Sequence, residues 1–320
     1  MHITLITPAK KQTRNGNRIS ALRWAKFLRQ DNNTVKIQTD YNYTKTDLMI
    51  ALHAWRSSNA IHKYKKLYPK RPLIVVIGGT DVNKFLQIDK DVTLKSMELA
   101  NAIVCLHDLV GELLPKYLHD KLHLIRQSAT PIPKTRKLSK RFFNVCVIGH
   151  LRNEKDALRA ALAARLAPAE SKIKITLFGK AYSSEWAKKA QKEITINKRF
   201  QWLGEVPRWR IRQEYSTTDL MVISSSQEGG ANVISEAIVA NVPIIASNIP
   251  GNIGLLGRHY PGYYPLKDEY ALLNILLKAE TDPNFLESIV NHYQHLKALF
   301  LPERESKNWL ALVNKVTGAK

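Results

Sequence analysis

Residues 220–237, with the sequence LMVISSSQEGGANVISEA, constrain the fold of this chain more than any other stretch. The apolar run Leu220–Ile223 predicts a buried strand, Gly229-Gly230 predicts a tight turn, and the residues that follow suit a helix. A helix that begins at the end of a strand presents backbone N–H groups that favour an anion. Glu228 and Glu236 flank that position. The combination suits a nucleotide sugar, and the alternative is an ordinary strand–turn–helix with solvated glutamates.

The length and composition of the chain indicate its number of domains and its class of protein. At 320 residues the chain exceeds the usual size of one domain, so two domains of roughly 150 residues are expected. Its hydrophobic content of 44% and charged content of 24% are typical of a soluble globular protein. The N-terminus indicates a first strand rather than a signal peptide. Cys105 and Cys146 fall in apolar runs and are expected to be buried free thiols. We therefore predict a cytoplasmic protein.

The net charge of +22 is unevenly distributed. Residues 1–140 hold 25 lysines and arginines against 10 aspartates and glutamates, whereas residues 141–320 hold 24 against 17. A basic N-terminal half favours an anionic partner, such as a phosphorylated small molecule, an anionic lipid or nucleic acid. The alternative explanation is solubility. We see no interleaved aromatic residues of the kind that single-strand binders use, so nucleic acid is not expected.

Strand-like and helix-like segments alternate along the whole chain, which predicts an α/β fold of two Rossmann-like, doubly wound domains facing across a cleft. The Pro-containing, basic segment 129–141 is typical of an interdomain linker. We expect an acceptor-side domain at 1–135 and a nucleotide-sugar-binding domain with C-terminal helices at 136–320. The predicted strands lie at residues 2–7, 34–38, 48–52, 73–77, 103–106, 122–125, 142–148, 173–178, 200–203, 220–223 and 242–246.

The first strand of the second series is followed by GHLRNEK, residues 149–155. Arg152 and Lys155 stand there at a strand-to-helix turn, on the edge of the sheet where ligands bind. Two cations opposite the Gly229-Gly230 amides are suited to hold a diphosphate and neutralise its charge as it leaves. A pair of weak surface salt bridges is the alternative.

GHLRNEKD and EGGANVISEA together resemble the donor half of the retaining GT-B glycosyltransferases of family 4. The resemblance implies that Glu228 contacts the donor sugar, that Glu236 binds the ribose, and that Arg152 and Lys155 contact the diphosphate. It also implies that Gly16 belongs to a glycine loop that closes over the diphosphate. The first turn of the helix supplies backbone donors; with the glycine pair these residues are Gly229, Gly230, Ala231, Asn232 and Val233.

The N-terminal motifs narrow the resemblance. TPAKKQTRNGNR, DLMIALHAWRSS, PLIVVIGGTDV and SNIPGNIGLLG, in this order, resemble the selenosugar synthase subfamily of selenoneine biosynthesis. The resemblance implies that selenophosphate attacks the anomeric carbon of a UDP-sugar, with UDP-N-acetylglucosamine as the expected donor, and that loss of UDP and then of phosphate gives a 1-seleno-sugar. The chain departs from the motifs of that subfamily at Gly78–Asp81 and at Trp55. Both positions lie on the predicted acceptor side.

Candidate acceptor residues follow predicted strand ends in the basic domain. Arg18 and Arg56 are candidates to bind the oxygens of selenophosphate, with Asn17 assisting, and the alternative for each arginine is a surface helix position. His53 ends an apolar run and is a candidate to bind the sugar or move a proton, although a lone histidine there is more often structural. Thr80 and Asp81 end the next strand, where Asp81 is suited to orient hydroxyls or to cap a helix.

No metal or other cofactor is expected, because the histidines and cysteines form no ligand cluster and Asp89-Lys90-Asp91 lies in the wrong domain. Two alternatives to selenosugar synthesis stay open. One is transfer to a lipid, glycan or thiol acceptor, with peripheral contact to an anionic membrane. The other is a non-catalytic nucleotide- or nucleic-acid-binding protein on the same fold, against which the intact Arg152, Lys155, Glu228 and Glu236 argue.

Overall fold

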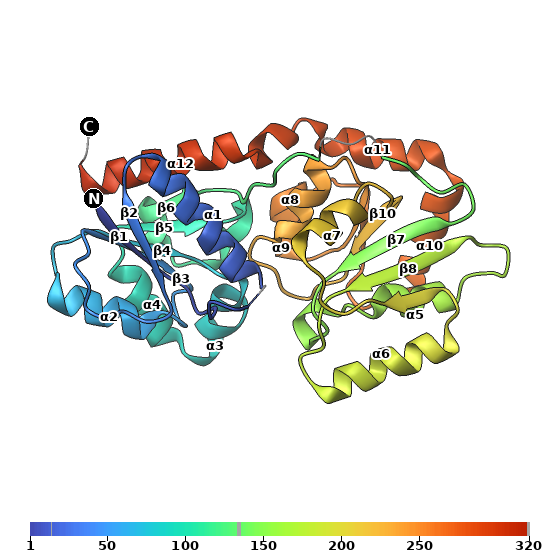
Figure 1. The fold of residues 1–320 in the computed structure, drawn as a ribbon, viewed down its shortest axis with the longest axis horizontal. Coiled ribbons are helices and arrows are strands. Elements are labelled where there is room, and N and C mark those ends of the chain that lie inside the picture. Colours follow the sequence, from blue (N-terminus) through green and yellow to red (C-terminus); the bar gives the residue numbers. More distant parts are fainter. Residues whose placement is uncertain (14, 133–135, 319–320) are drawn as a thin grey trace. The chain divides into compact units, whose positions relative to one another are not determined.

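The computed structural model describes residues 1–13, 15–132 and 136–318 and divides into two compact units (Figure 1). The first unit comprises Met1–Ser128, Glu228–Asn232 and Leu299–Lys320, and the second comprises Ala129–Gln227 and Val233–Ala298. The domain boundary predicted between residues 135 and 136 adjoins 133–135, which lie outside the described residues.

The first unit is built on a parallel six-stranded sheet with the order β2-β1-β3-β4-β5-β6. Its strands are β1 (His2–Ile6), β2 (Thr34–Gln38), β3 (Leu48–Leu52), β4 (Leu73–Val76), β5 (Ala102–Cys105) and β6 (Leu122–Leu124). Its helices are α1 (Gly16–Gln30), α2 (Ser58–Leu67), α3 (Leu86–Ile88), α4 (Lys90–Glu98) and α12 (Pro302–Thr317). Shorter turns are the π-helical η1 (Asp81–Phe85) and the 3₁₀ segments η2 (Asp108–Leu113), η3 (Lys116–Lys121) and η5 (Lys297–Phe300).

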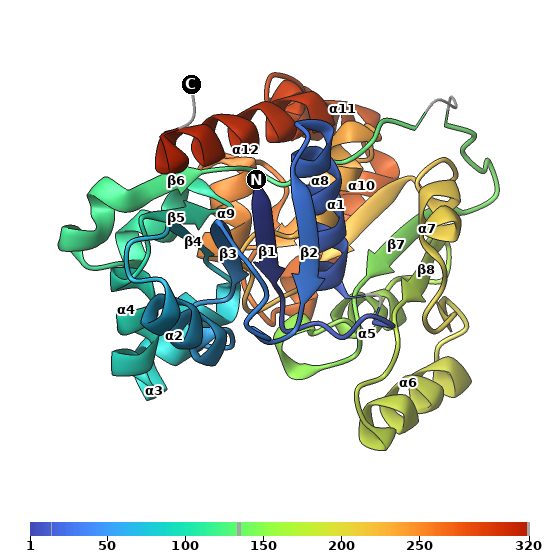
Figure 2. The same ribbon diagram turned by 60° about the vertical axis from the view of Figure 1, so that its left-hand side comes forward.

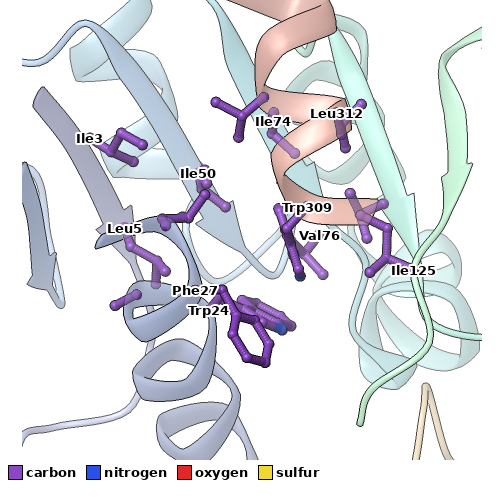
Figure 3. Close-up of a cluster of buried hydrophobic side chains, with 14 of the residues drawn as sticks. Ile3, Leu5, Trp24, Phe27, Ile50, Ile74, Val76, Ile125, Trp309 and Leu312 are labelled. Carbon is purple, nitrogen blue, oxygen red and sulfur yellow. The ribbon is translucent and has the colours of Figure 1, made fainter. Parts of the chain in front are cut away.

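Alternate residues of these strands pack on the two faces of the sheet, as the twofold strand period requires. Helix α12 lies beside β6 (Figure 2). Ile3, Leu5, Ile50, Ile74 and Val76 pack with the buried sides of α1 and α12 (Figure 3). The opposite set, which includes Ile6, Met49 and Val75, packs with α2 and α4. Both faces are therefore covered, which explains why the central strands β3, β4 and β5 are continuously apolar rather than alternating.

Helix α12 belongs to this first core. The Trp24 and Trp309 ring centroids lie 4.9 Å apart (Figure 3), and Leu312 and Val313 are buried in the same cluster. The assignment of all C-terminal helices to the second domain is therefore wrong for α12, because its apolar stripe is complementary to the first sheet and to α1.

The second unit is built on a second parallel six-stranded sheet, with the order β12-β11-β10-β7-β8-β9. Its strands are β7 (Phe143–Ile148), β8 (Ile173–Phe178), β9 (Phe200–Trp202), β10 (Leu220–Ile223), β11 (Ile244–Ser247) and β12 (Tyr263–Tyr264). Its helical segments are η4 (Asn153–Lys155), α5 (Arg159–Arg165), α6 (Ser184–Ile196), α7 (Arg208–Glu214), α8 (Asn232–Val239), α9 (Pro250–Leu256), α10 (Glu269–Thr281) and α11 (Pro283–Gln294). This is the Rossmann order 3-2-1-4-5-6, which reverses direction between β7 and β10.

The α/β class, the two Rossmann-like parallel sheets and the eleven predicted strands are confirmed, with ends that differ by one or two residues. The sequence also predicts a helix around Lys155–Leu166, which begins later in the structure: residues 153–155 form the 3₁₀ turn η4 and Asp156 has a φ of 42°, so α5 starts only at Arg159. The short strand β12 was not predicted. Among the described residues, no helix has the length and apolarity that crossing a membrane would require.

Candidate functional site

The switch point of the second sheet brings together the segments after β7 and β10. Ser226 N donates to the Glu154 carbonyl oxygen at 2.9 Å, and the Ser224 hydroxyl donates to the Asp156 carbonyl oxygen at 2.8 Å. These hydrogen bonds fix the turn that carries Arg152 and Lys155 against the end of β10. Ligands of doubly wound sheets bind at such a switch point.

Arg152 lies between an acid and an aromatic ring. Its Nε is 3.9 Å from a Glu154 carboxylate oxygen, and its guanidinium carbon is 5.3 Å from the centroid of the Tyr182 ring. Within the described residues, the buried Nε forms no hydrogen bond. Lys180, which the sequence analysis did not select, lies 5.3 Å from the same ring. Lys180 could have been selected from the sequence, because it directly follows Gly179, the residue after strand β8.

Glu236 on α8 interacts with Tyr215 and Arg208 of the second unit. The Tyr215 hydroxyl donates to Oε2 at 3.2 Å, and Arg208 Nη2 lies 3.7 Å from Oε1. Burial raises the pKa of Tyr215 far above its usual value, and the charge of Glu236 raises it further, so the phenol stays protonated and donates. Neither Tyr215 nor Arg208 was predicted, because nothing in the local sequence links them to Glu236.

Glu228–Asn232 belongs to the first unit, where its glycines make close backbone contacts. A Cβ on Gly229 would lie 2.1 Å from the Gly79 nitrogen, and a Cβ on Gly230, which has a φ of +138°, would lie 2.4 Å from Leu106 Cβ. Gln127 Nε2 donates to the Gly230 carbonyl oxygen at 2.6 Å. The glycine pair therefore permits close packing as well as a turn, which a side chain would prevent.

A buried carboxylate anchors the neighbourhood of this loop. Glu305, which is 1% exposed, accepts hydrogen bonds from Arg23 Nε at 2.8 Å and from Trp24 Nε1 at 2.7 Å. The same Arg23 donates to the side-chain oxygen of Asn232 at 3.1 Å. One hydrogen-bond network thus links α12 to α1 and to the segment Glu228–Asn232. The buried carboxyl group of Glu305 is paired with Arg23 in this network, as a buried charged group requires.

His53 and Asp81 form a buried pair at the carboxyl edge of the first sheet. His53 Nδ1 lies 3.1 Å from Asp81 Oδ2, and Asp81 also accepts hydrogen bonds from the amides of Ala54 (3.1 Å), Trp55 (3.1 Å) and Gly78 (2.8 Å). Burial alone would raise the pKa of Asp81, but the His53 ring and the amides outweigh it and hold the pKa below its usual value. An ionised carboxylate only accepts, so Nδ1 carries the proton and Nε2 is the acceptor of a neutral ring.

The backbone around His53 is specialised. His53 has a φ of 74°, an unusual conformation for a residue with a side chain, and such strain is concentrated at functional sites. Gly78 packs against the ring so closely that a Cβ would lie 1.9 Å from His53 Cε1.

The predicted contact of Asp81 with an acceptor is contradicted. Its side chain is 0% exposed and both oxygens accept hydrogen bonds within the first unit, so it holds His53 instead. Thr80 precedes it, and among the described residues its buried hydroxyl has no hydrogen-bond partner.

The other predicted residues of the first unit follow strand ends. Gly16 and Asn17 begin α1, which follows β1, and Asn15 caps that helix by accepting from the Arg18 amide at 3.1 Å. Arg56 is exposed after β3, with its guanidinium carbon 5.9 Å from the Phe85 ring centroid. The sheet order reverses between β1 and β3, so these residues lie at the switch point of the first sheet.

Asp89 supports the packing of an aromatic pair. Its Oδ2 accepts from Trp55 Nε1 at 2.6 Å, and the Trp55 ring stacks on Phe85 at 3.9 Å. Among residues 1–13, 15–132 and 136–318, no three histidine, cysteine, aspartate or glutamate side chains form a group suited to a metal ion.

Residues 130–295, more than half of the chain, match the family Glycosyl transferases group 1. The chain belongs to this family. The matched residues include both segments of the second switch point, so family membership and geometry coincide there.

Relatives across the group 1 family differ in how much they share with this chain. A Xenopus tropicalis protein, "Glycosyltransferase 1 domain-containing protein 1", is 22% identical over 332 residues, covering 95% of this chain and 96% of that protein. The Bacillus subtilis "Putative teichuronic acid biosynthesis glycosyltransferase TuaC" is 27% identical over 105 residues, which is 32% of this chain and only 27% of TuaC. The structure of Anabaena Alr3699/HepE in complex with UDP and glucose superposes with a TM-score of 0.79 at 15% identity, covering 98% of this chain and 100% of HepE. This likeness establishes the GT-B fold.

Proposed function

We propose that the chain is a glycosyltransferase that uses a UDP-sugar as donor. The observation that carries the proposal is the second switch point, where the turn bearing Arg152 and Lys155 is hydrogen-bonded to the end of β10 by Ser226 and Ser224. A diphosphate needs cations at a sheet edge, and this turn carries two of them. Membership of the group 1 family and the UDP and glucose bound by HepE support the same donor class.

In this proposal Arg152 and Lys155 bind the diphosphate and stabilise the charge on the leaving UDP. Glu236, oriented by Tyr215 and Arg208, binds the ribose hydroxyls. Backbone groups of Gly16 and of the segment Gly229–Val233 are proposed to bind donor phosphates, and Glu228 is proposed to bind the donor sugar. His53 contributes its Nε2 acceptor to a sugar hydroxyl, with Asp81 holding the ring.

For the acceptor we propose selenophosphate and, for the sugar, N-acetylglucosamine. Selenium attacks the anomeric carbon as the bond from that carbon to the UDP oxygen breaks. Water then cleaves the phosphorus–selenium bond, which releases phosphate and leaves the 1-seleno-sugar. The N-terminal motifs and the excess of cations in residues 1–140 support a small, highly charged acceptor. Asn17, Arg18, Arg56 and Thr80 are the proposed acceptor residues.

The test incubates the protein with UDP-N-acetylglucosamine and either selenophosphate or inorganic phosphate, and measures UDP release and a selenium-containing sugar by mass spectrometry. The proposal predicts both products with selenophosphate only. The Arg56→Ala variant should raise the selenophosphate concentration needed for half-maximal rate while UDP affinity stays unchanged. Turnover of UDP-sugar only with other acceptors would reject selenophosphate but keep the transferase.

A second candidate is transfer to a glycan or lipid acceptor. The name of the Bacillus subtilis relative, which refers to teichuronic acid biosynthesis, supports it. Sedimentation with anionic vesicles and an assay with lipid-linked or oligosaccharide acceptors separate the two candidates. Salt-sensitive vesicle binding together with turnover on those acceptors, and none on selenophosphate, would select the second.

A further inference from the structure

A pocket of about 430 Å³ lies in the first unit, between the end of β6 and helix α12. Strand β6 is the last strand of its sheet, so it has no neighbouring strand on the outer side. None of the donor, acceptor or catalytic residues named above lines this pocket. Its volume falls in the range of small-molecule sites, roughly 300–1,000 Å³.

Helix α12 presents a polar stripe to the pocket. Arg304, Asn308, Ala311 and Lys315 line it, and their spacing of four, three and four residues puts them on one face of the helix. At a rise of 1.5 Å per residue, Arg304 and Lys315 are separated by roughly 16 Å along the axis. Two cations therefore stand at the ends of the stripe, and the small Ala311 lies between them.

The opposite wall adds His123 and Arg126. Arg126 forms an ion pair with Asp108 at 2.6 Å, whereas His123, Arg304 and Lys315 have no ion-pair partner in the described part of the chain. Burial lowers the pKa of His123, and the charge of Lys315 lowers it further. The pocket thus carries an excess of positive charge that the protein itself does not neutralise.

The wall between the charged ends is apolar. Ile125 and Leu312 are buried and line the pocket together with Leu299. A ligand that fits has anionic groups at two positions and an uncharged body that covers these side chains. Isolated inorganic phosphate satisfies only one end.

We propose that this pocket binds a soluble small molecule with two separated anionic groups, phosphate or carboxylate, one toward Arg304 and one toward Lys315. The site is separate from the donor and acceptor sites, so the proposal stands whether or not the proposed transfer reaction is correct. Charge-assisted hydrogen bonds from arginine to such groups are among the strongest that a site of this kind can offer.

The test titrates the full-length protein with dodecanedioate, which carries a carboxylate at each end of an apolar chain, and with its monomethyl ester, which keeps the chain but only one carboxylate. Both titrations are calorimetric and are made at constant ionic strength. Two pocket variants are compared, Arg304→Gln/Lys315→Gln and Ala311→Trp, the second of which fills the pocket without changing charge. The control Lys26→Gln/Lys307→Gln removes the same two charges from α1 and α12 outside the pocket. Arg152→Ala reports binding in the second unit.

The proposal predicts that dodecanedioate binds at least tenfold more tightly than its monomethyl ester. Both pocket variants should lose at least tenfold in dodecanedioate affinity, and the control and Arg152→Ala should retain it. An equal loss in the control would mean nonspecific charge attraction, and a loss in Arg152→Ala alone would put the anion in the second unit; either result overturns the proposal. So would a failure of dodecanedioate to bind wild type, whether or not phosphatidylserine vesicles bind wild type and not the pocket variants.

Discussion

His53 Nδ1 is 3.1 Å from Asp81 Oδ2, and this contact joins the residues that follow two neighbouring strands of the first sheet. The carboxylate is 0% exposed and also accepts three backbone amides. It therefore fixes the proton on Nδ1 and directs Nε2 as the acceptor. His53 is therefore an oriented polar group and not only a packing residue.

Asp81→Asn should lower the transfer rate up to about tenfold, because the His53 ring loses the orientation on which its hydrogen bond to the sugar depends. The free energy of unfolding should fall by about 1–3 kcal/mol, since the amide group cannot accept from all four donors. A double-mutant cycle with His53→Gln separates the effects: Asp81→Asn should add nothing to the loss of rate in the His53→Gln background. If the losses of rate caused by the two substitutions multiplied independently, Asp81 would not act through His53.

Gly78→Ala should displace the His53 ring, because the added Cβ would lie 1.9 Å from Cε1. We expect a destabilisation of about 1–3 kcal/mol, as for other overpacked sites, together with a loss of transfer activity. Gly111→Ala is the matched control, since its Cβ would lie 3.4 Å from the nearest side-chain atom. Equal unfolding midpoints for the two variants in urea would contradict the close contact.

Tyr215→Phe should raise KM for the UDP-sugar about three- to tenfold, because Glu236 loses a hydrogen bond worth about 1 kcal/mol. The unfolding free energy should change by a similar amount. Tyr293→Phe removes another buried hydroxyl in the same unit, which donates to the Val242 carbonyl oxygen at 2.8 Å. Steady-state kinetics should show an unchanged KM for this control. If both variants raised KM alike, Tyr215 would have no specific role at Glu236.

His107 should make stability depend on pH between about 6.5 and 4. Burial is the main cause that lowers its pKa from 6.5 to about 4; the charge of Arg126 acts in the same direction, and the charges of Asp108 and Glu228 oppose it. The unfolded chain therefore takes up a proton before the folded one does, so stability falls as pH drops through this range, by up to about 3 kcal/mol.

His107→Asn keeps a side chain that can cap η2, where His107 Nδ1 accepts from the Leu109 amide at 3.3 Å. Urea unfolding of both proteins at several pH values should show a shallower loss in the variant. Parallel curves for wild type and variant would remove His107 as the cause. Asp81, whose pKa is lowered, acts in a different range, because its contribution is lost only as pH falls below its usual value.

The sheets were predictable because apolar runs and Gly or Pro breaks mark each parallel strand directly. The same signals place Arg152, Lys155 and His53 at the ends of strands. Helix α12 was assigned to the wrong domain because an apolar stripe shows that a helix packs, but not on which sheet.

The partners of the site residues were not predictable. Tyr215 precedes Glu236 by 21 residues, and Gly79 lies 150 residues before Gly229, so neither contact leaves a local pattern. Asp81 ends a strand-like run in the same way as an exposed ligand-binding residue would. Only its four internal hydrogen bonds show that it supports His53.

In the proposed reaction, the turn after β7 binds the diphosphate of a UDP-sugar. The most direct measurement is calorimetric titration of UDP into the wild-type protein and the Arg152→Ala variant. We predict that wild type binds UDP and that the variant binds it about 10- to 100-fold more weakly, the loss of one charge-assisted hydrogen bond. Equal UDP affinity in the two proteins, or no UDP binding by wild type, would contradict the account.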